Sequence, residues 1–230
     1  DLQDLIVRAR PGGIVLAAPL SNMPEIVDAV TATDTPCVRL STGSANGKEY
    51  TVATNDREVC AEMTRYLASL KHQRIGFIKG DRTHKAVTNR FDGYKEGLGQ
   101  AGLNFDATLV AEGDNSIGSG EQCAEQLLHL EPRPTAIFCA NDDMAAGVVR
   151  VATRMGISIP DQLSVAGFDD IALAQQIFPS LTTIRQPLSA MAEAASRALI
   201  DRARGQPRDP QLEIVPATIE LRESTGPAPA

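Results

Sequence analysis

Two apolar runs of the sequence end in polar side chains that could bind a ligand. Asn141 opens the run NDD directly after TAIFCA, and Asp169 and Asp170 follow LSVAGF. Amide and carboxylate oxygens at such positions can accept hydrogen bonds from the hydroxyl groups of a polyol. The same residues also suit helix capping or contact with solvent, above all Asp170. The sequence therefore predicts a ligand site here and leaves capping open as the alternative.

Arg90 is a third candidate, in the segment NRFDGY that comes after the apolar run RIGFIKG. A guanidinium group presents a planar fork of donors, which could hold two neighbouring hydroxyl groups or a carboxylate. A single arginine near the start of a helix is more often a surface residue. Its spacing alone therefore leaves both interpretations open.

No segment of the sequence is typical of an active site or a metal site. No G-x-S-x-G turn is present, and His72, His84 and His129 lack metal-ligand spacing, so we expect them to be structural or on the surface. Asp142 and Asp143 have no neighbouring histidine or third carboxylate with which to bind a metal or transfer protons. The segments GSANGK and GSG match neither a P-loop nor a dinucleotide fingerprint. We expect no catalytic residue, no metal and no cofactor, and hence a protein that is not an enzyme.

The composition indicates a folded chain that is by itself a poor partner for nucleic acid. Of its 230 residues 43% are hydrophobic, which is enough to form a substantial core. The net charge of −7 would repel a phosphate backbone. No apolar run reaches the roughly 18 to 20 residues of a membrane helix. The cysteines are widely spaced, so we expect free, buried thiols in a reducing compartment: Cys37, Cys60, Cys123 and Cys139.

Short apolar runs alternate with amphipathic segments along the chain. The runs have the length of strands, are rich in Val and Ile and do not alternate with polar residues, which is typical of strands buried on both faces. Alternation of such strands with helices predicts a doubly wound α/β fold, whose ligands bind at the carboxyl ends of the strands. The expected strands span residues 13–19, 35–40, 74–80, 108–113, 135–140 and 163–170.

Several boundaries can also be placed. We expect Ser116 to lead a helix, Gly156 to end one, and residues 43–51 to form a loop or hairpin tip. Residues 226–230 are too poor in core-forming side chains to pack. The first residues, DLQDLIVRAR, indicate an amphipathic helix with residue 1 in its middle. A doubly wound domain that opens with a helix should have a strand before it, so we expect a strand that this sequence lacks.

Six segments taken together resemble one bacterial family. They are KHQRIGFIKG, RFDGY, PTAIFCANDDMAAG, IPDQLSVAGFDD, PSLTTIRQP and LRES, all between residues 71 and 224. In this order and at this spacing they are typical of the effector-binding core of LacI/GalR-family transcription regulators, which the chain resembles over nearly its whole length. The resemblance implies a periplasmic-binding-protein-like fold with two lobes, each a doubly wound, mostly parallel sheet. Compared with the family, the first lobe lacks its N-terminal strand-helix-strand unit.

The resemblance also implies where the lobes begin and end. By family position, residues 1–71 and 186–207 form the N-terminal lobe, and residues 72–185 and 208–224 form the C-terminal lobe. Residues 225–230 are a tail, and the DNA-binding headpiece of the family is absent from this sequence.

Five residues occupy positions that bind ligands in the family. Arg90, Asn141 and Asp169 match with good motif support, and Gln186 matches with less. Asn115 falls where relatives often place an aromatic ring over the ligand. Because the chain has no Trp, we expect little stacking on the ligand.

Two positions depart from the family pattern. Lys71 stands where relatives usually have glycine, and Asn55-Asp56 reverses the common Asp-Asn order. The reversal puts a ligand role for that loop in doubt.

The resemblance implies the ligand-sensing core of a DNA-binding transcriptional repressor. A small effector, such as a sugar or a related polyol, sugar acid or phosphate, would bind between the lobes and change operator binding allosterically. The operator would be contacted through the missing headpiece of a cytoplasmic homodimer, whose surface would include MAAGVVRVATRM and IALAQQIF. No membrane is involved. The alternative is a periplasmic sugar-binding protein of a transporter, which the four cysteines and the segments LTTIRQP and LRES disfavour.

Overall fold

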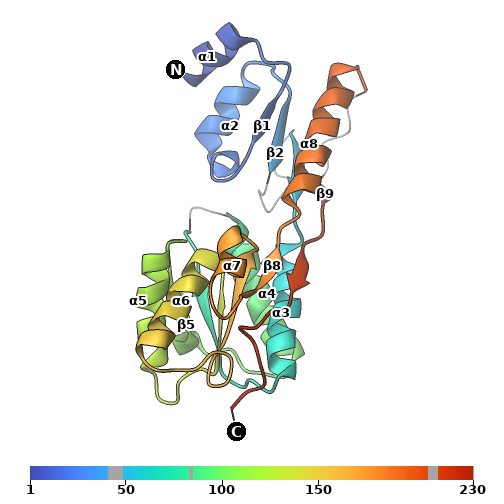
Figure 1. Ribbon diagram of the computed structural model, residues 1–230. Helices are drawn as coiled ribbons and strands as arrows, with labels where there is room; N and C mark the ends of the chain where they lie inside the picture. Colours follow the sequence, from blue (N-terminus) through green and yellow to red (C-terminus); the bar gives the residue numbers. More distant parts are fainter. Residues whose placement is uncertain (41–48, 83–84, 207–211, 230) are drawn as a thin grey trace. The chain divides into compact units, whose positions relative to one another are not determined.

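The computed structural model describes residues 1–40, 49–82, 85–206 and 212–229 (Figure 1). Within it the chain forms two compact units. The first consists of Asp1–Asn55, Thr83–Ala86 and Pro187–Pro216, and the second of Asp56–Arg82, Val87–Gln186 and Ala217–Ala230. The lobe boundaries at residues 71, 185 and 207 that the resemblance implies stay a prediction.

The second unit is built on a six-stranded sheet in the order β10-β8-β7-β6-β4-β5. Its neighbouring strands are parallel except for β10, which runs antiparallel to β8. This confirms the expected doubly wound, mostly parallel architecture, and it brings the carboxyl ends of β5 to β8 to one edge of the sheet. The strands are β4 (Ile75–Lys79), β5 (Val110–Glu112), β6 (Ala136–Cys139), β7 (Ser164–Asp169), β8 (Thr182–Arg185) and β10 (Thr218–Glu220).

The helices of this unit cover its sheet. They are α3 (Asp56–Ser69), α4 (Lys85–Gln100), the 3-10 turn η2 (Ala107–Leu109), α5 (Ile117–Leu128), α6 (Asp142–Arg154) and α7 (Ala172–Gln176). Helices α5 and α6 lie side by side (Figure 1). They approach closely because each presents a glycine: a Cβ at Gly120 would come within 2.3 Å of the Met144 carbonyl oxygen, and one at Gly147 within 2.4 Å of the Ile117 carbonyl oxygen.

An aromatic cluster fills the core beneath β4. The ring of Phe77 packs edge-on against Phe138 and stacks on Tyr94, and all three side chains are fully buried. The Tyr94 hydroxyl donates to the carbonyl oxygen of Ile75 at 2.7 Å, so its polar end is satisfied. The tyrosine of the RFDGY segment therefore fixes α4 to the sheet.

The first unit is built on a four-stranded parallel sheet in the order β1-β2-β3-β9. Successive residues of β2 face opposite sides: Val38 joins the cluster under α8, and Cys37 joins the cluster with α1 and α2. The elements are α1 (Leu2–Ala9), β1 (Ile14–Leu16), η1 (Leu20–Asn22), α2 (Pro24–Thr31), β2 (Cys37–Leu40), β3 (Tyr50–Ala53), α8 (Leu188–Ala203) and β9 (Leu212–Ile214).

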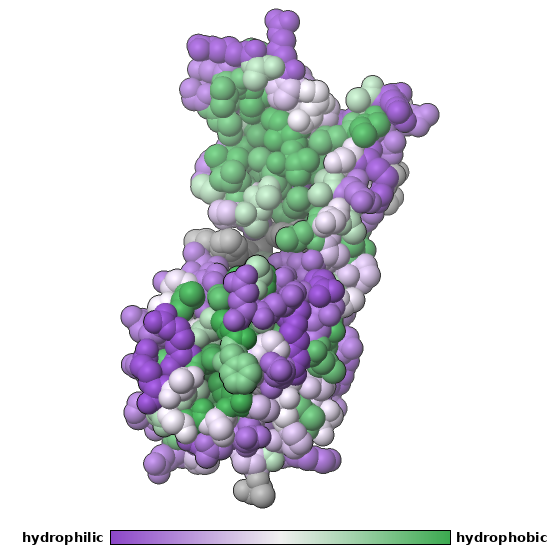
Figure 2. All heavy atoms as spheres, viewed as in Figure 1, coloured by the Kyte–Doolittle hydropathy of each residue, from purple (hydrophilic) through white to green (hydrophobic). Residues whose placement is uncertain are grey.

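Strand β1 lies at the edge of this sheet, and Val15 on it is 42% exposed. Figure 2 shows hydrophobic residues over a wide part of the face that carries β1 and α2. The expectation that the first lobe lacks a strand-helix-strand unit stays a prediction.

Four local expectations hold in the structure. The Ser116 side chain caps α5 by accepting from the Ser119 N–H, and Gly156 takes φ 69° just after α6. The cysteines are all free and buried. His72 is fully buried, whereas His129 is exposed and bonded to the Glu125 carbonyl oxygen. His84 lies outside the described residues.

Two local expectations are corrected. Asp1 caps α1 through its side chain instead of lying within the helix. Tyr50 and Thr51 belong to β3, not to a loop, because they pair with β2 and β9; residues 43–48 of that segment lie outside the described residues.

The C-terminal segment is held down by its backbone. The Gly226 N–H donates to the Ser164 hydroxyl at 3.0 Å, and the Ala228 N–H donates to the Leu70 carbonyl oxygen at 2.8 Å. His72 contacts the Gly226 carbonyl oxygen at 3.1 Å. The expectation that residues 226–230 do not pack is therefore wrong for this part, since backbone hydrogen bonds can order a segment that lacks apolar side chains.

Within the described part of the chain, no helix combines the length and the apolar character that crossing a membrane requires.

Candidate functional site

Arg90 lies within α4 and directs its guanidinium into the second unit. Its Nε donates to Asp56 Oδ2 at 3.1 Å and its Nη1 donates to the Ala140 carbonyl oxygen at 2.6 Å, while the group lies 3.5 Å from the centre of the Phe168 ring. Only 12% of the side chain is exposed, so Arg90 is not a surface residue. Burial alone would lower the pKa of Arg90, but the carboxylates of Asp56 and Asp169 outweigh it and raise the pKa. The group is a fixed cation.

Asp169 ends β7 and faces Arg90. Its Oδ1 accepts from the Gln186 side chain at 2.5 Å and lies 3.7 Å from Arg90 Nη2. Its φ of 115° lies in the region that favours glycine, so the surrounding structure holds this residue in a strained conformation. Burial raises the pKa of Asp169 although Arg90 and Gln186 oppose the shift, and Asp56 and Asp143 add to it.

Gln186 follows β8, the strand beside β7, and its N–H points at the Asp169 carbonyl oxygen at 3.5 Å. The parallel pairing of the two strands therefore places Gln186 next to Asp169. The structure thus brings Arg90, Asp169 and Gln186 together at the carboxyl ends of β7 and β8.

Asn141 and Asn115 pair with each other and with the backbone. The Asn141 side chain caps α6 by accepting from the Met144 N–H at 3.0 Å, and its Nδ2 donates to the Asn115 carbonyl oxygen at 2.9 Å. Asn115 Oδ1 accepts from the Asp81 N–H at 3.3 Å, which ties the segment after β5 to that after β4. Capping by Asn141 is therefore confirmed, and a ligand contact by either asparagine stays a prediction.

Asp142 lies beneath the site and is fully buried. Its two oxygens accept from the Thr183 hydroxyl at 2.5 Å and from the Ile171 N–H at 3.0 Å, so it joins α6, β8 and the segment before α7. Burial raises the pKa of Asp142 to about 7, and the nearby Asp169 and Asp170 act in the same direction, whereas its hydrogen bonds oppose the shift.

Asp170 forms neither a helix cap nor a solvent-facing group. Its carboxylate is 3% exposed and pairs with Arg185 at 2.6 Å and with Arg222 at 2.5 Å. Arg222, from the LRES segment, also donates to the Leu181 carbonyl oxygen at 2.8 Å. The expectation of capping or solvation for Asp170 is therefore wrong, because two arginines distant in sequence neutralise it.

Asp56 is the member of this site that the sequence did not assign. Its position at the start of α3, shortly after β3, was the available signal, but the inverted Asn55-Asp56 order argued against a role. The structure shows that Asp56 is 4% exposed and bonded to Arg90.

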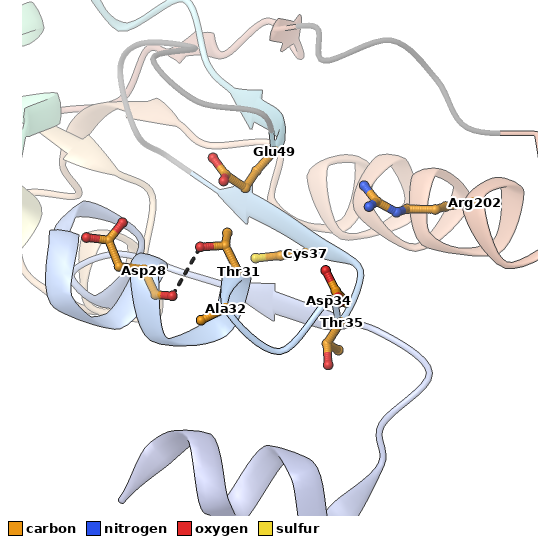
Figure 3. Close-up of a pocket in the computed structure, with 8 residues that line it drawn as sticks. All are labelled: Asp28, Thr31, Ala32, Asp34, Thr35, Cys37, Glu49 and Arg202. Atoms are coloured by element: carbon orange, nitrogen blue, oxygen red, sulfur yellow. Dashed lines mark hydrogen bonds between the residues drawn. The ribbon is translucent and has the colours of Figure 1, made fainter.

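A separate pocket of about 510 Å³ lies in the first unit (Figure 3). Its lining includes Asp28, Asp34, Cys37, Glu49 and Arg202. Burial raises the pKa of the Cys37 thiol to about 11, and the Glu49 carboxylate adds to the shift, so the thiol is uncharged at neutral pH. Nothing in the sequence had indicated this pocket.

Comparison with known proteins identifies relatives of this chain. A model of the periplasmic binding protein-like domain matches residues 64–225. The chain is 31% identical over 188 residues to the HTH-type transcriptional repressor PurR of Vibrio atlanticus, covering 81% of this chain and 56% of that protein. It is 34% identical over 179 residues to the repressor CytR of Escherichia coli strain K12, covering 78% of this chain and 52% of that protein. It thus spans about half the length of these relatives.

Solved structures show the same fold. The transcriptional regulator CelR in complex with cellobiose superposes with a TM-score of 0.89 at 28% identity, covering 97% of this chain and 68% of that one. A LacI-family regulator from Enterococcus faecium with bound ribose gives a TM-score of 0.86 at 26% identity, covering 98% and 83%. The relatives are named as transcriptional regulators and not as enzymes. The chain belongs to the periplasmic-binding-protein-like family, in the form of the effector-binding domain of LacI-family transcriptional regulators.

Proposed function

We propose that this chain is the sensor core of a DNA-binding repressor, and that a small hydroxyl-rich effector binds at the carboxyl ends of β7 and β8. Arg90, Asp169 and Gln186 would contact the effector directly, and Asn141 and Asn115 would border it. The observation that carries this proposal is the buried cluster around Arg90, in which Asp169 is held in a strained conformation. Such strain is typical of binding sites whose geometry the surrounding fold imposes.

The named ligands of two structural relatives support a sugar or a related compound. The CelR structure holds cellobiose and the Enterococcus faecium regulator holds ribose. Hydroxyl groups both donate and accept hydrogen bonds, which suits a site that offers carboxylate acceptors beside guanidinium donors. The transporter-protein alternative has no such support, because these relatives are regulators.

Regulation would follow from a change of conformation. We propose that the two units correspond to the two lobes of the family and that the effector shifts the balance between two of their arrangements. A separate headpiece would carry operator binding, in a cytoplasmic homodimer. The net charge of −7 agrees with a core that does not itself hold DNA.

An apolar surface on α6 and α7 supports the dimer. Phe178 is 87% exposed beside a groove of about 480 Å³ that Val149, Leu173 and Ile177 help to line. Figure 2 shows hydrophobic residues on the face of the second unit that carries these helices. A protruding ring next to an apolar groove suits self-association about a two-fold axis, in which each copy offers both features.

Titration calorimetry with ribose, cellobiose and a panel of sugars and nucleosides tests the effector site. For any compound that binds, Asp169→Asn should weaken binding by about 2 kcal/mol or more, since a buried hydroxyl would lose a charged acceptor. Asp161→Asn, which removes one carboxylate from an exposed turn of the same unit, is the matched control and should leave the affinity unchanged. Equal affinities for wild type and Asp169→Asn would contradict the assignment.

A further inference from the structure

The two carboxylates around Arg90 do more than hold it in place, because they also set the charge of the site. Of the guanidinium donors, Nε is engaged by Asp56 and one Nη1 hydrogen by the Ala140 carbonyl oxygen, and Nη2 faces Asp169. Phe168 closes one face of the group. The remaining N–H groups are therefore presented in a fixed orientation, next to Asp169.

Asp169 offers a matching acceptor. Gln186 and Arg90 both approach its Oδ1, and no hydrogen bond to its Oδ2 occurs among the described residues. The Asp169 side chain keeps 26% of its surface exposed, so a ligand can reach it. A donor and an acceptor therefore stand side by side.

Carboxylates outnumber cations at this place among the described side chains. Arg90 faces both Asp56 and Asp169, and Asp143 lies close enough to affect Asp169. The neighbouring arginines, Arg185 and Arg222, are occupied by Asp170.

We propose that Asp56 determines the charge specificity of this site: by pairing with Arg90 it makes the site select neutral vicinal hydroxyl groups and reject a carboxylate or phosphate group. The inference rests on the proposed function of the site. Asp56 is a positioning residue here, since it acts through Arg90 and not by touching the ligand.

The chemistry of the ligand groups explains the selection. A hydroxyl oxygen can accept from Arg90 while its hydrogen is donated to Asp169 Oδ2, so a diol satisfies both residues. A carboxylate can accept from Arg90 but has no hydrogen to donate to Asp169. A phosphate keeps at least one O–H when it is free, but it brings negative charge next to Asp169, and like charges in a shielded site repel strongly. An ammonium group can donate to Asp169 but cannot accept from Arg90. A neutral hydroxyl pair meets both demands without adding charge to the site.

The test compares matched probes by titration calorimetry at constant ionic strength. Neutral ribose and cellobiose are paired with ribose 5-phosphate and cellobionate, against wild type, Asp56→Asn, Asp56→Glu and a control. The control is Glu96→Gln, which removes one carboxylate from α4 at an exposed position where Glu96 pairs with Arg57. In wild type the neutral member of a pair should bind about tenfold or more tightly than the anionic member. Asp56→Asn should reduce that ratio, whereas Asp56→Glu and Glu96→Gln should keep it.

Inorganic phosphate supplies a probe that does not depend on the effector's identity. In thermal denaturation, phosphate should not stabilise wild type beyond chloride of equal ionic strength, and should stabilise Asp56→Asn. Stabilisation of wild type by phosphate that Arg90→Gln abolishes would overturn the inference, and so would an anionic sugar that binds wild type as well as its neutral partner. Either result leaves the proposed function intact. If no member of the sugar and nucleoside panel binds, the proposed function fails instead, and the phosphate measurement still decides the charge of the site.

Discussion

The pair formed by Arg90 and Asp56 should couple strongly in the stability of the second unit. We consider Arg90→Met, which keeps most of the volume, together with Asp56→Asn and the double variant. The two side chains are 12% and 5% exposed and their charged atoms lie 3.1 Å apart. At an effective dielectric constant of about 20, opposite charges at about 4 Å attract by about 4 kcal/mol. Desolvation offsets part of this, so we expect a coupling energy of about 2 kcal/mol.

Arg90→Met alone should lower the free energy of unfolding by more than the coupling energy between Arg90 and Asp56. It leaves Asp56 buried without this cation, a change that typically costs about 3 to 5 kcal/mol. It also removes the contact with the Phe168 ring and the hydrogen bond to the Ala140 carbonyl oxygen. The double variant should therefore be more stable than the sum of the two single changes predicts.

Urea denaturation followed by far-ultraviolet circular dichroism is the assay, because the chain has no Trp to report by fluorescence. The exposed pair of Arg57 and Glu96 is a matched control, since it joins the same two helices at 2.7 Å with side chains 56% and 39% exposed. Its coupling should be much smaller, because solvent screens it. If the Arg90 and Asp56 changes add to within about 0.5 kcal/mol, the pair is not coupled and Asp56 does not set the charge of Arg90.

Three further outcomes are expected. Lys71 has φ 75°, so Lys71→Gly should raise the free energy of unfolding by up to about 1 kcal/mol, measured in urea; a decrease would show that this conformation is not strained. Burial lowers the pKa of His72, so the unfolded chain takes up its proton first as pH falls, and stability should decrease from about pH 6.5 downward. His72→Gln should lack that part of the pH dependence. The raised pKa of Asp142 favours the folded state as pH falls, but this effect is the same in both proteins and cancels in the comparison. Identical stability profiles for wild type and His72→Gln would contradict the assignment. Phe178→Asp should shift the dimer to monomer in light scattering, and a monomeric wild type would remove the proposed interface.

The pattern of apolar residues predicted most of the elements, because a strand that is buried on both faces appears in the sequence as a continuous apolar run. The runs around Phe77, Phe138 and Phe168 are continuous and apolar, and each became a central strand of the six-stranded sheet. Strands β3, β8, β9 and β10 were missed because they are short and carry polar residues. β9 and β10 lie at sheet edges, where burial places a weaker demand on residue type.

Lys71 departs from the glycine that relatives usually have, and its backbone conformation shows why glycine suits this position. The family's glycine at this position was known only as a pattern. The backbone explains it, because Lys71, two residues past the end of α3, takes a left-handed conformation that glycine adopts without strain. Among the described residues, the hydrogen bond that the Lys71 N–H donates to the Ala68 carbonyl oxygen is the only one of this residue that could offset the strain.

The sequence by itself determined the fold class, the strand ends that carry Asn141 and Asp169, and the family. These depend on local patterns and on motifs, which are properties of the chain as written. Only the tertiary structure decided that Asp56 pairs with Arg90, that Arg185 and Arg222 neutralise Asp170, and that the backbone of the C-terminal segment is held beside His72. Each of these contacts joins residues far apart in sequence, and burial is what makes them strong. A pairing of that kind leaves no periodic trace, because it depends on which elements the folded chain brings together.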